Sequence, residues 1–206
     1  MPTAGEKLKD ALQRNASIFG IELNDQMRSR LAAYYEILLK WNDRLHLVAP
    51  CSPAEFAVRH VLESLLLLPY LRPGARLVDV GSGAGLPAIP CLIARSDVKA
   101  SLIETSKRKA IFLREALRHL NIQEQADVIA SRFEELNAVP ADVVTSRALD
   151  RFAETLPKLI AWAPRQSTLA LFGNERLRAQ LKQQWPQVKA QRIPKSDRRL
   201  LIIIER

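Results

Sequence analysis

The segment LVDVGSGAGLP, residues 77–87, is the most informative for the fold, because an apolar run changes there into glycines separated by small residues. Residues Arg76–Val80 have the composition of a buried strand, and the loop Gly81–Gly85 that follows carries little side-chain bulk. Glycine permits positive φ and lets the main chain approach a ligand with no Cβ in the way. A helix is predicted from about Gly85 to Ala94. Its first N–H groups are unpaired and its N-terminus is the positive end of the helix dipole, so this end suits an anionic group. The segment therefore predicts a strand, a ligand-binding loop and a helix.

The chain after residue 73 repeats this alternation of short apolar runs and helical stretches. Further strands are predicted at Lys99–Glu104, Val128–Ser131, Val143–Ser146 and Thr168–Phe172, and a hairpin at Gln187–Ile193 and Leu200–Glu205. Helices are predicted at Ser106–Leu120, Phe152–Trp162 and Glu175–Gln184. Repeated β-α units imply a parallel sheet covered by helices on both faces. The predicted fold class is thus α/β and Rossmann-like, a mostly parallel seven-stranded sheet with an antiparallel edge hairpin.

The first 72 residues are predicted to be helical. Leu31, Tyr34, Tyr35 and Leu38 recur at the spacing of one helix face, which predicts a helix from about Asp25 to Trp41. Weaker patterns predict helices at Glu6–Phe19 and, opened by Pro53, at 53–68. We therefore expect a helical extension over residues 1–72 and a main domain over residues 73–206, together forming one compact unit.

The basic charge is concentrated in the second part of the chain. The net charge is +9; residues 1–72 hold 9 Lys and Arg against 8 Asp and Glu, and residues 73–206 hold 22 against 14. A basic main domain favours a polyanionic partner such as nucleic acid, although a basic surface that serves only solubility is the alternative.

Membrane and secretory classes are disfavoured by the sequence. The longest apolar run, near Val61–Leu68, is too short to cross a bilayer, and the N-terminus lacks a secretory pattern. Two cysteines, Cys51 and Cys91, make neither a metal-ligand pattern nor a disulfide framework. We expect a cytoplasmic protein without a metal site.

The spacing of the glycines distinguishes between ligands. Dinucleotide sites favour G-x-G-x-x-G, whereas this loop reads G-x-G-x-G with Asp79 two residues before it. Glu104 ends the second predicted strand, where a carboxylate can accept hydrogen bonds from both hydroxyls of a ribose. This arrangement is typical of enzymes that use S-adenosyl-L-methionine. A purely structural glycine turn and a nicotinamide site remain the alternatives.

Further motifs narrow this interpretation to a family. Between Trp41 and Gly173 they are WNDRLHL, HVLES, VDVGSGAGLPAIP, LIETSKRKAIFL, SRFEE and DVVTSRA, in this order. The stretch resembles the bacterial 16S ribosomal RNA guanine-N7 methyltransferases, the glucose-inhibited division protein B family. The resemblance implies a class I methyltransferase that transfers a methyl group from S-adenosyl-L-methionine to N7 of one guanine in 16S rRNA. The implied partner is 16S rRNA or the small ribosomal subunit, and we expect a monomer.

The resemblance also implies the site residues. Gly81 and Leu86 would line the cofactor, Glu104 would bind the ribose, and Phe133 and Glu134 would lie beside the adenine. With the other two glycines of the loop, the predicted cofactor site is Gly81, Gly83, Gly85, Leu86, Glu104, Phe133, Glu134 and Arg147.

Arg147 is the candidate catalytic residue, placed after the fourth strand of the methyltransferase sheet. Guanine N7 carries an in-plane lone pair and no proton, so no general base is required and positioning supplies most of the acceleration. Arg147 is expected to position either the guanine, as arginine does in bidentate guanine contacts, or the cofactor carboxylate. A structural ion pair with Asp150 is the alternative for this residue. For His60, a hydrogen-bonded structural role is favoured over a catalytic one.

The sequence identifies the residues that contact RNA less clearly than it identifies the cofactor site. Candidates for phosphate contacts are Lys107, Arg108, Lys109, Arg151, Arg176, Arg178, Lys182, Arg198 and Arg199. The chain departs from the family pattern at His46, Val48, Ala88, residues 165–167, and Phe172, which stands where the family carries lysine. Phe172 leaves open a second hypothesis, a module that binds S-adenosylmethionine and RNA without turnover, and a different methyl acceptor is a third.

Overall fold

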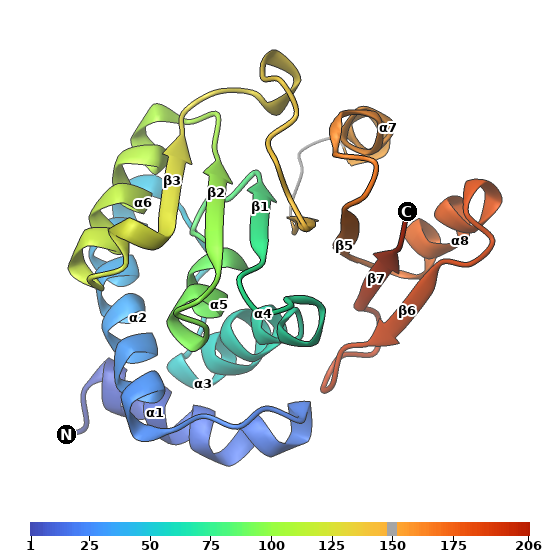
Figure 1. The fold of residues 1–206 in the computed structure, drawn as a ribbon. Coiled ribbons are helices and arrows are strands. Elements are labelled where there is room, and N and C mark those ends of the chain that lie inside the picture. The colour runs from blue at the N-terminus through green and yellow to red at the C-terminus, as the bar shows by residue number, and fades with distance from the viewer. Residues whose placement is uncertain (148–151) are drawn as a thin grey trace.

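The computed structural model describes residues 1–147 and 152–206, and within that part of the chain the strands form one seven-stranded sheet (Figure 1). The order in the sheet is β3-β2-β1-β4-β5-β7-β6. Strands β1 to β5 pair in parallel, and β7 runs antiparallel to both β5 and β6. The strands are β1 (Arg76–Val80), β2 (Lys99–Ile103), β3 (Ala126–Ile129), β4 (Val143–Ser146), β5 (Thr168–Gly173), β6 (Lys189–Arg192) and β7 (Leu200–Ile204). The predicted fold class is confirmed.

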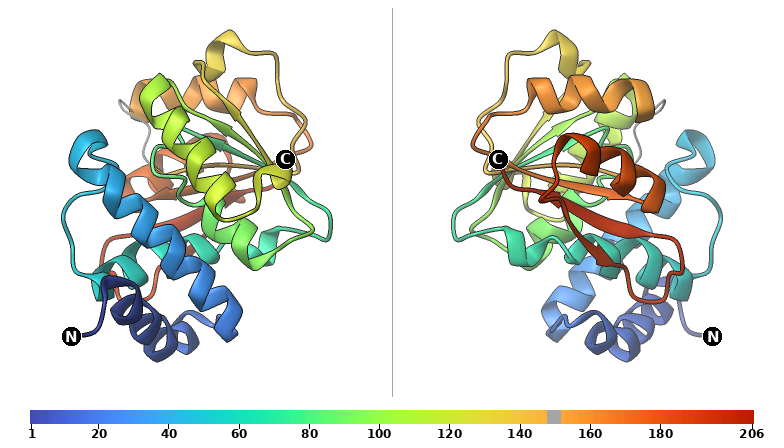
Figure 2. Two further views of the ribbon diagram at one scale, coloured as in Figure 1. Left: turned by 90° about the vertical axis from the view of Figure 1, so that its left-hand side faces the viewer. Right: turned by 90° about the vertical axis from the view of Figure 1, so that its right-hand side faces the viewer.

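The alternation of side chains along the strands divides the core into two layers. Leu77 of β1 packs with one layer of helices, and its neighbours Val78 and Val80 pack with the other. The first layer consists of α5 (Ala88–Ala94), α6 (Lys107–His119) and the N-terminal helices, and the second of α7 (Phe152–Trp162) and α8 (Glu175–Gln184). The views in Figure 2 show the sheet between these layers.

The N-terminal helices cover the first face of the sheet. They are α1 (Ala4–Asn15), the 3-10 turn η1 (Ala16–Phe19), α2 (Asp25–Leu45), α3 (Pro53–Phe56), the π-helix η2 (Ala57–Leu62), α4 (Glu63–Leu65) and the 3-10 turn η3 (Leu68–Tyr70). Side chains cap several of these helices: Thr3 forms a capping box with Glu6, and the Asn24 side chain accepts from the Met27 N–H at 2.8 Å. Helix α2 then packs against α5 and α6, which brings the extension to the back of the glycine loop.

Two observed boundaries near the loop differ from the predicted ones. Helix α5 begins at Ala88, three residues after the predicted start, because Gly85 has φ of 83° and cannot be helical. Strand β3 covers Ala126–Ile129, two residues earlier than predicted, so Ser131 lies in the loop beyond the strand. Two residues, Leu86 and Pro87, connect the glycine loop to α5, and the Ile89 N–H in the first turn of α5 donates to the Gly85 carbonyl at 2.7 Å.

The predicted third helix is interrupted by the π-helix η2. Residues 53–65 are helical throughout, but six of them form the wider turns of η2, which carries Arg59 and His60. Turns of this kind are often found at functional sites because they re-aim side chains and free backbone groups. No helix in the described part of the chain is both long and apolar enough to traverse a membrane.

Candidate cofactor and substrate site

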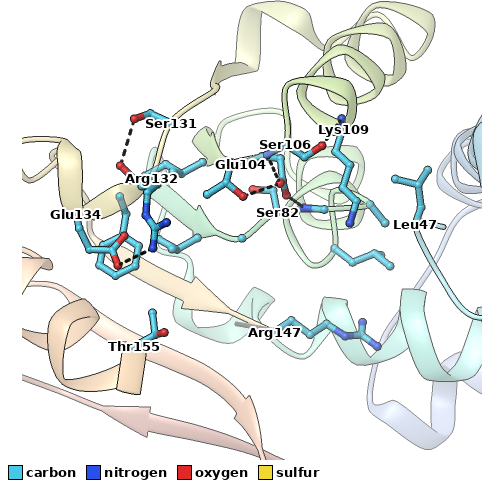
Figure 3. A pocket seen from close by; sticks show the side chains of 18 of the residues that line it. Leu47, Ser82, Glu104, Ser106, Lys109, Ser131, Arg132, Glu134, Arg147 and Thr155 are labelled. Atoms are coloured by element: carbon cyan, nitrogen blue, oxygen red, sulfur yellow. Dashed lines mark hydrogen bonds and ion pairs between the residues drawn. The ribbon is translucent and has the colours of Figure 1, made fainter. Parts of the chain in front are cut away.

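A cavity of about 960 Å³ opens at the carboxyl ends of β1, β2 and β4 (Figure 3). The strand order reverses between β1 and β4, and ligands of open α/β sheets bind at such a switch point. Of the predicted site residues, the cavity is lined by Gly81, Gly83, Leu86, Glu104, Phe133, Glu134 and Arg147. Segments that are far apart in the sequence are thus brought to one cavity, and Gly85 is not among its lining residues.

The loop after β1 is shaped by its three glycines. Gly81, Gly83 and Gly85 have φ of 75°, 51° and 83°, values that L residues with a side chain rarely adopt. A Cβ on Gly83 would meet open space, with the Gly81 carbonyl oxygen 3.8 Å away, so the bare backbone leaves that space to a ligand. A Cβ on Gly85 would instead lie 2.4 Å from Ile89 Cδ1. Gly83 therefore keeps the cavity open, and Gly85 allows the loop to pack on α5.

Glu104 lies directly after β2 and is held by the main chain. Its Oε2 accepts from the Gly83 N–H at 2.8 Å and its Oε1 from the Ser106 N–H at 2.8 Å. The Thr105 hydroxyl also lies 3.4 Å from Oε1 as a long, weak donor. Of the about four acceptor positions on this carboxylate, one therefore remains free and one is only weakly used, and Glu104 is only 7% exposed. Two adjacent ligand hydroxyls are the donors that would satisfy it, and this fits the predicted ribose contact.

Asp79 lies beneath the loop and is completely buried. Neither carboxylate oxygen makes a hydrogen bond of standard geometry within the described residues. Burial raises the pKa of Asp79 to about 8, although the Ser82 hydroxyl and the Ala88 N–H lower it in part. The folded protein therefore holds a proton on Asp79 at neutral pH.

This proton makes stability depend on pH. Between the unfolded pKa of 3.8 and the folded value of about 8, only the folded state binds it, so the contribution of Asp79 to stability decreases as pH rises. Urea unfolding of the ligand-free protein should show that this contribution falls by about 2 kcal/mol from pH 6 to pH 8. Asp79→Asn should remove that part of the pH dependence. The control Asp10→Asn, at an exposed position of α1, should leave the pH dependence unchanged. An identical pH dependence in wild type and Asp79→Asn would contradict the assignment.

Phe133 and Glu134 form part of the wall beyond β3, in the 3-10 turn η5 (Phe133–Glu135). Phe133 is buried and packs edge-on against Trp162 of α7, with ring centroids 5.6 Å apart. The Glu134 carboxylate lies 3.8 Å from the Arg132 guanidinium. This side of the cavity thus combines an apolar surface with a carboxylate; the family resemblance implies that the adenine lies here, and that placement stays a prediction.

The Arg147 side chain extends toward the N-terminal helices (Figure 3). Its guanidinium lies 3.0 Å from His60 Nδ1 and 3.5 Å from a Glu63 carboxylate oxygen, and it donates to the main-chain carbonyls of Arg59 and His60. Burial and the nearby Arg147 lower the pKa of His60 to about 3, so its ring is neutral and accepts from Arg147. The structural role expected for His60 agrees with this contact, and the alternative partner Asp150 lies outside the described residues.

Glu63 joins this cluster to the C-terminal hairpin. Glu63 is 1% exposed, and its carboxylate also pairs with Arg199 at 2.6 Å. Burial raises the pKa of Glu63 to about 7, even though Arg147 and Arg199 lower it. Arg199, a predicted phosphate contact, is therefore occupied within the protein. The Phe172 ring packs against the Arg147 guanidinium, with 5.8 Å between the ring centroid and Arg147 Cζ. Phe172 does not line the cavity.

Several lining residues were not predicted from the sequence as part of the cofactor site. They are Leu47, Val48, Ser82, Ser106, Lys109, Ser131, Arg132, Glu154, Thr155 and Lys158, among others. Ser131 and Arg132 belong to the SRFEE motif, so their position next to Phe133 was a usable signal. Glu154, Thr155 and Lys158 of α7 belong to none of the motifs found in the sequence, and only the tertiary structure places that helix beside the cavity.

Sequence comparisons identify the family of this chain. The sequence model of the family described as rRNA small subunit methyltransferase G matches residues 27–197. A ribosomal RNA small subunit methyltransferase G of Neisseria gonorrhoeae is 36% identical over 186 residues, which cover 90% of this chain and 85% of the relative. One from Xanthomonas axonopodis pv. citri is 46% identical over 125 residues, covering 60% and 58% of the two chains.

Solved structures support the fold. M. jannaschii TYW2 in complex with AdoMet superposes with a TM-score of 0.57 at 14% identity, covering 70% of this chain and 74% of that one. The mitomycin 7-O-methyltransferase MmcR superposes with a TM-score of 0.61 at 15% identity, covering 100% and 74%. The matched family model, the similarity over nine-tenths of the chain and the glycine loop over a cavity lead to one conclusion: the chain belongs to the small-subunit ribosomal RNA methyltransferase G family.

Proposed function

We propose that this protein transfers a methyl group from S-adenosyl-L-methionine to N7 of a guanine in 16S rRNA of the small ribosomal subunit. The observation that carries the proposal is the Glu104 carboxylate, fixed by two main-chain amides at the cavity wall with acceptor capacity left over. Membership of the family supplies the reaction and the acceptor. The proposed cofactor-binding residues are Gly81, Gly83, Leu86, Glu104, Phe133 and Glu134. Gly85 does not line the cavity, and its lack of a side chain allows the loop to pack on α5.

The residues present fit this cofactor. Glu104 offers acceptors to ribose hydroxyls, and Gly83 leaves space that a Cβ would occupy. Phe133 offers an apolar surface beside the Glu134 carboxylate for a planar base. These groups suit a nucleoside with free hydroxyls.

Bound S-adenosylmethionine supplies an electrophilic methyl group on its sulfonium sulfur. The residues of the chain then need only hold the acceptor nitrogen in line with it, because guanine N7 has no proton to remove. His60 is neutral and hydrogen-bonded to Arg147, and we assign it no proton transfer. We propose that Arg147 acts as a positioning residue that shapes the wall between the cavity and the N-terminal helices.

The hypothesis of a binding module without turnover rested on Phe172. This residue is buried against Arg147 and lies outside the cavity lining, so its replacement of a lysine leaves the described walls of the site intact. We therefore favour a working enzyme. Transfer of radiolabelled methyl groups to small subunits that lack N7 methylation tests this choice. Label at one 16S rRNA guanine N7 would support the proposal; label on another acceptor, or cofactor binding without transfer, would overturn it.

We propose that the RNA approaches over the first turn of α6. Lys109 lines the cavity, and Lys107 and Arg108 beside it are exposed. Arg132 and Lys158 add cationic side chains on other walls of the same cavity. Arg176, Arg178 and Lys182 of α8 do not line it, and Arg178 pairs with Glu175 at 2.8 Å. Arg151 lies outside the described residues.

Methylation is expected to weaken steeply as salt is added, because each neutralised phosphate releases counterions. With about three phosphate contacts, the KM for RNA should rise about 20- to 40-fold between roughly 50 and 200 mM salt. The double variant Lys107→Ala/Arg108→Ala should reduce that slope, and Lys7→Ala on α1 should leave it unchanged. A KM that is independent of salt in the wild type would remove the basic face from RNA binding.

We also propose that the protein acts as a cytoplasmic monomer and that residues 1–72 and 73–206 form one compact unit. Apolar side chains of α1 and α2 share one core cluster with those of α5 and α6, which supports the second point. Light scattering of the purified protein, which measures its molar mass in solution, tests whether it is a monomer.

A further inference from the structure

Tyr34 of helix α2 reaches the glycine loop from behind. It is completely buried, and its hydroxyl donates to the main-chain carbonyl oxygen of Ala84 at 2.6 Å. The two residues are 50 positions apart, so the bond joins the N-terminal helices to the centre of the loop. Burial raises the pKa of Tyr34 far above its ordinary value, and the hydroxyl therefore keeps its proton and remains a donor.

The Ala84 carbonyl needs this donor. The positive φ angles on both sides of it, at Gly83 and Gly85, keep this stretch out of regular secondary structure. Ala84 is 5% exposed, and a buried carbonyl without a partner costs about 1–3 kcal/mol. A loop that lost the Tyr34 bond would therefore shift so that this oxygen reaches another donor.

The other hydrogen bonds of the loop lie inside it or join it to β1, β2 and α5: the Ser82 hydroxyl donates to the Asp79 carbonyl at 2.9 Å, and the Ile89 N–H donates to the Gly85 carbonyl at 2.7 Å. Gly81 N–H donates to the Ile103 carbonyl at 2.9 Å, and Gly85 N–H donates to the Ser82 carbonyl at 2.6 Å. Gly83 N–H donates to Glu104 at 2.8 Å. Among the described residues, Tyr34 is the side chain that connects the loop to the N-terminal helices by a hydrogen bond. Its helix is itself fixed, because α2 packs against α5 and α6.

We infer that Tyr34 is a positioning residue for the cofactor loop: its hydroxyl fixes Ala84 in the conformation that directs Gly83 N–H to Glu104 and keeps the cavity wall preformed. The inference rests on the proposed binding of S-adenosylmethionine at this loop. Preorganisation of this kind increases affinity by removing the cost of ordering the loop when the ligand binds. Helix α2, none of whose residues lines the cavity, thus contributes to cofactor affinity through the loop.

The chain offers a matched control for this inference. Tyr35 is adjacent on the same helix, is 3% exposed, and packs against the same Phe56 ring, with ring centroids 4.5 Å apart for Tyr35 and 6.4 Å for Tyr34. No hydrogen bond within the described residues joins Tyr35 to the loop. Tyr34→Phe and Tyr35→Phe each remove one oxygen atom, and only the first removes the bond to Ala84.

The test measures S-adenosylmethionine affinity by calorimetry, and loop protection by amide hydrogen exchange without ligand, well below the Tm of each variant. Tyr34→Phe should raise the Kd about tenfold and speed exchange at Ser82–Gly85, whereas its transfer rate at saturating cofactor should stay within about twofold of wild type. Tyr35→Phe should match wild type in both measurements. A lower Tm for Tyr34→Phe with unchanged Kd and unchanged loop exchange would overturn the inference and leave Tyr34 a core residue. Absence of binding by the wild type would instead refute the proposed function.

Discussion

Replacement of Glu104 by alanine is expected to abolish useful binding of S-adenosylmethionine while the protein stays folded. The carboxylate is the acceptor that the structure offers to a ribose, and hydrogen bonds to charged groups contribute about 1.5–3 kcal/mol each. Loss of two such bonds should weaken binding by about 3 kcal/mol or more, which is at least about a hundredfold in Kd. Isothermal calorimetry on purified protein measures this change.

Two further variants separate the charge from the shape of Glu104. Glu104→Gln keeps the size of the side chain but replaces one acceptor oxygen with a donor, so its Kd should fall between those of wild type and Glu104→Ala. Glu124→Ala, in the exposed turn η4 (Gln123–Gln125), should bind like wild type. Unchanged affinity in Glu104→Ala would move the ribose to another part of the cavity, and a collapse of the Tm with intact affinity would make Glu104 a structural residue.

Replacement of Gly83 by leucine should prevent cofactor binding with only a small loss of stability. A Cβ at this position meets no atom of the protein closer than 3.8 Å, so the leucine side chain would extend into the cavity. The backbone φ of 51° costs a residue with a Cβ about 1–2 kcal/mol, or a few degrees of Tm in a chain of this size. Calorimetry should detect no binding, and thermal unfolding should show a cooperative transition near that of wild type.

Gly85→Leu is the matched contrast, because its Cβ would lie 2.4 Å from Ile89 Cδ1 and 3.1 Å from Leu113 Cδ2. Overpacking of this kind costs about 1–3 kcal/mol in addition to the strain at φ of 83°, so a loss of about 3 kcal/mol is expected. If Gly83→Leu binds the cofactor normally, the loop is not the wall of the site. If Gly85→Leu is as stable as wild type, the assignment of Gly85 to packing is wrong.

Local sequence signals located most of the strands and the residues that follow them. Strand β4 and helix α8 match their predicted ranges, because each is bounded by clear signals such as Asn174, which caps α8. Other boundaries were wrong by two to four residues: α5 begins three residues late because of the positive φ at Gly85, β3 lies two residues early, and α2 continues to Leu45, four residues beyond its predicted end. The π-helix around His60 could not be predicted, because its periodicity differs from that of an α-helix by too little to be read from six residues.

The residues that surround Arg147 also could not be predicted from the sequence. A nearby acid in the chain, Asp150, was the natural candidate for its partner, yet Glu63 lies 84 positions before Arg147 and meets it only because the N-terminal helices pack against the end of β4. Tyr34 is similar: its spacing marks a buried helix face, and nothing in that pattern distinguishes a hydroxyl that reaches the glycine loop from one that does not.

The alternation of strands and helices, the glycine loop after β1 and the acid after β2 can all be read from the sequence, because they depend on local conformational preference and on spacing along the chain. The tertiary structure alone decided what lies behind and across from that loop: the Tyr34 hydroxyl on Ala84, the cluster of Arg147, His60 and Glu63, and the wall formed by α7. The physical reason is that side-chain contacts between distant segments depend on how helices pack on the two faces of the sheet, and the apolar patterns that drive this packing do not specify which polar atoms it brings together.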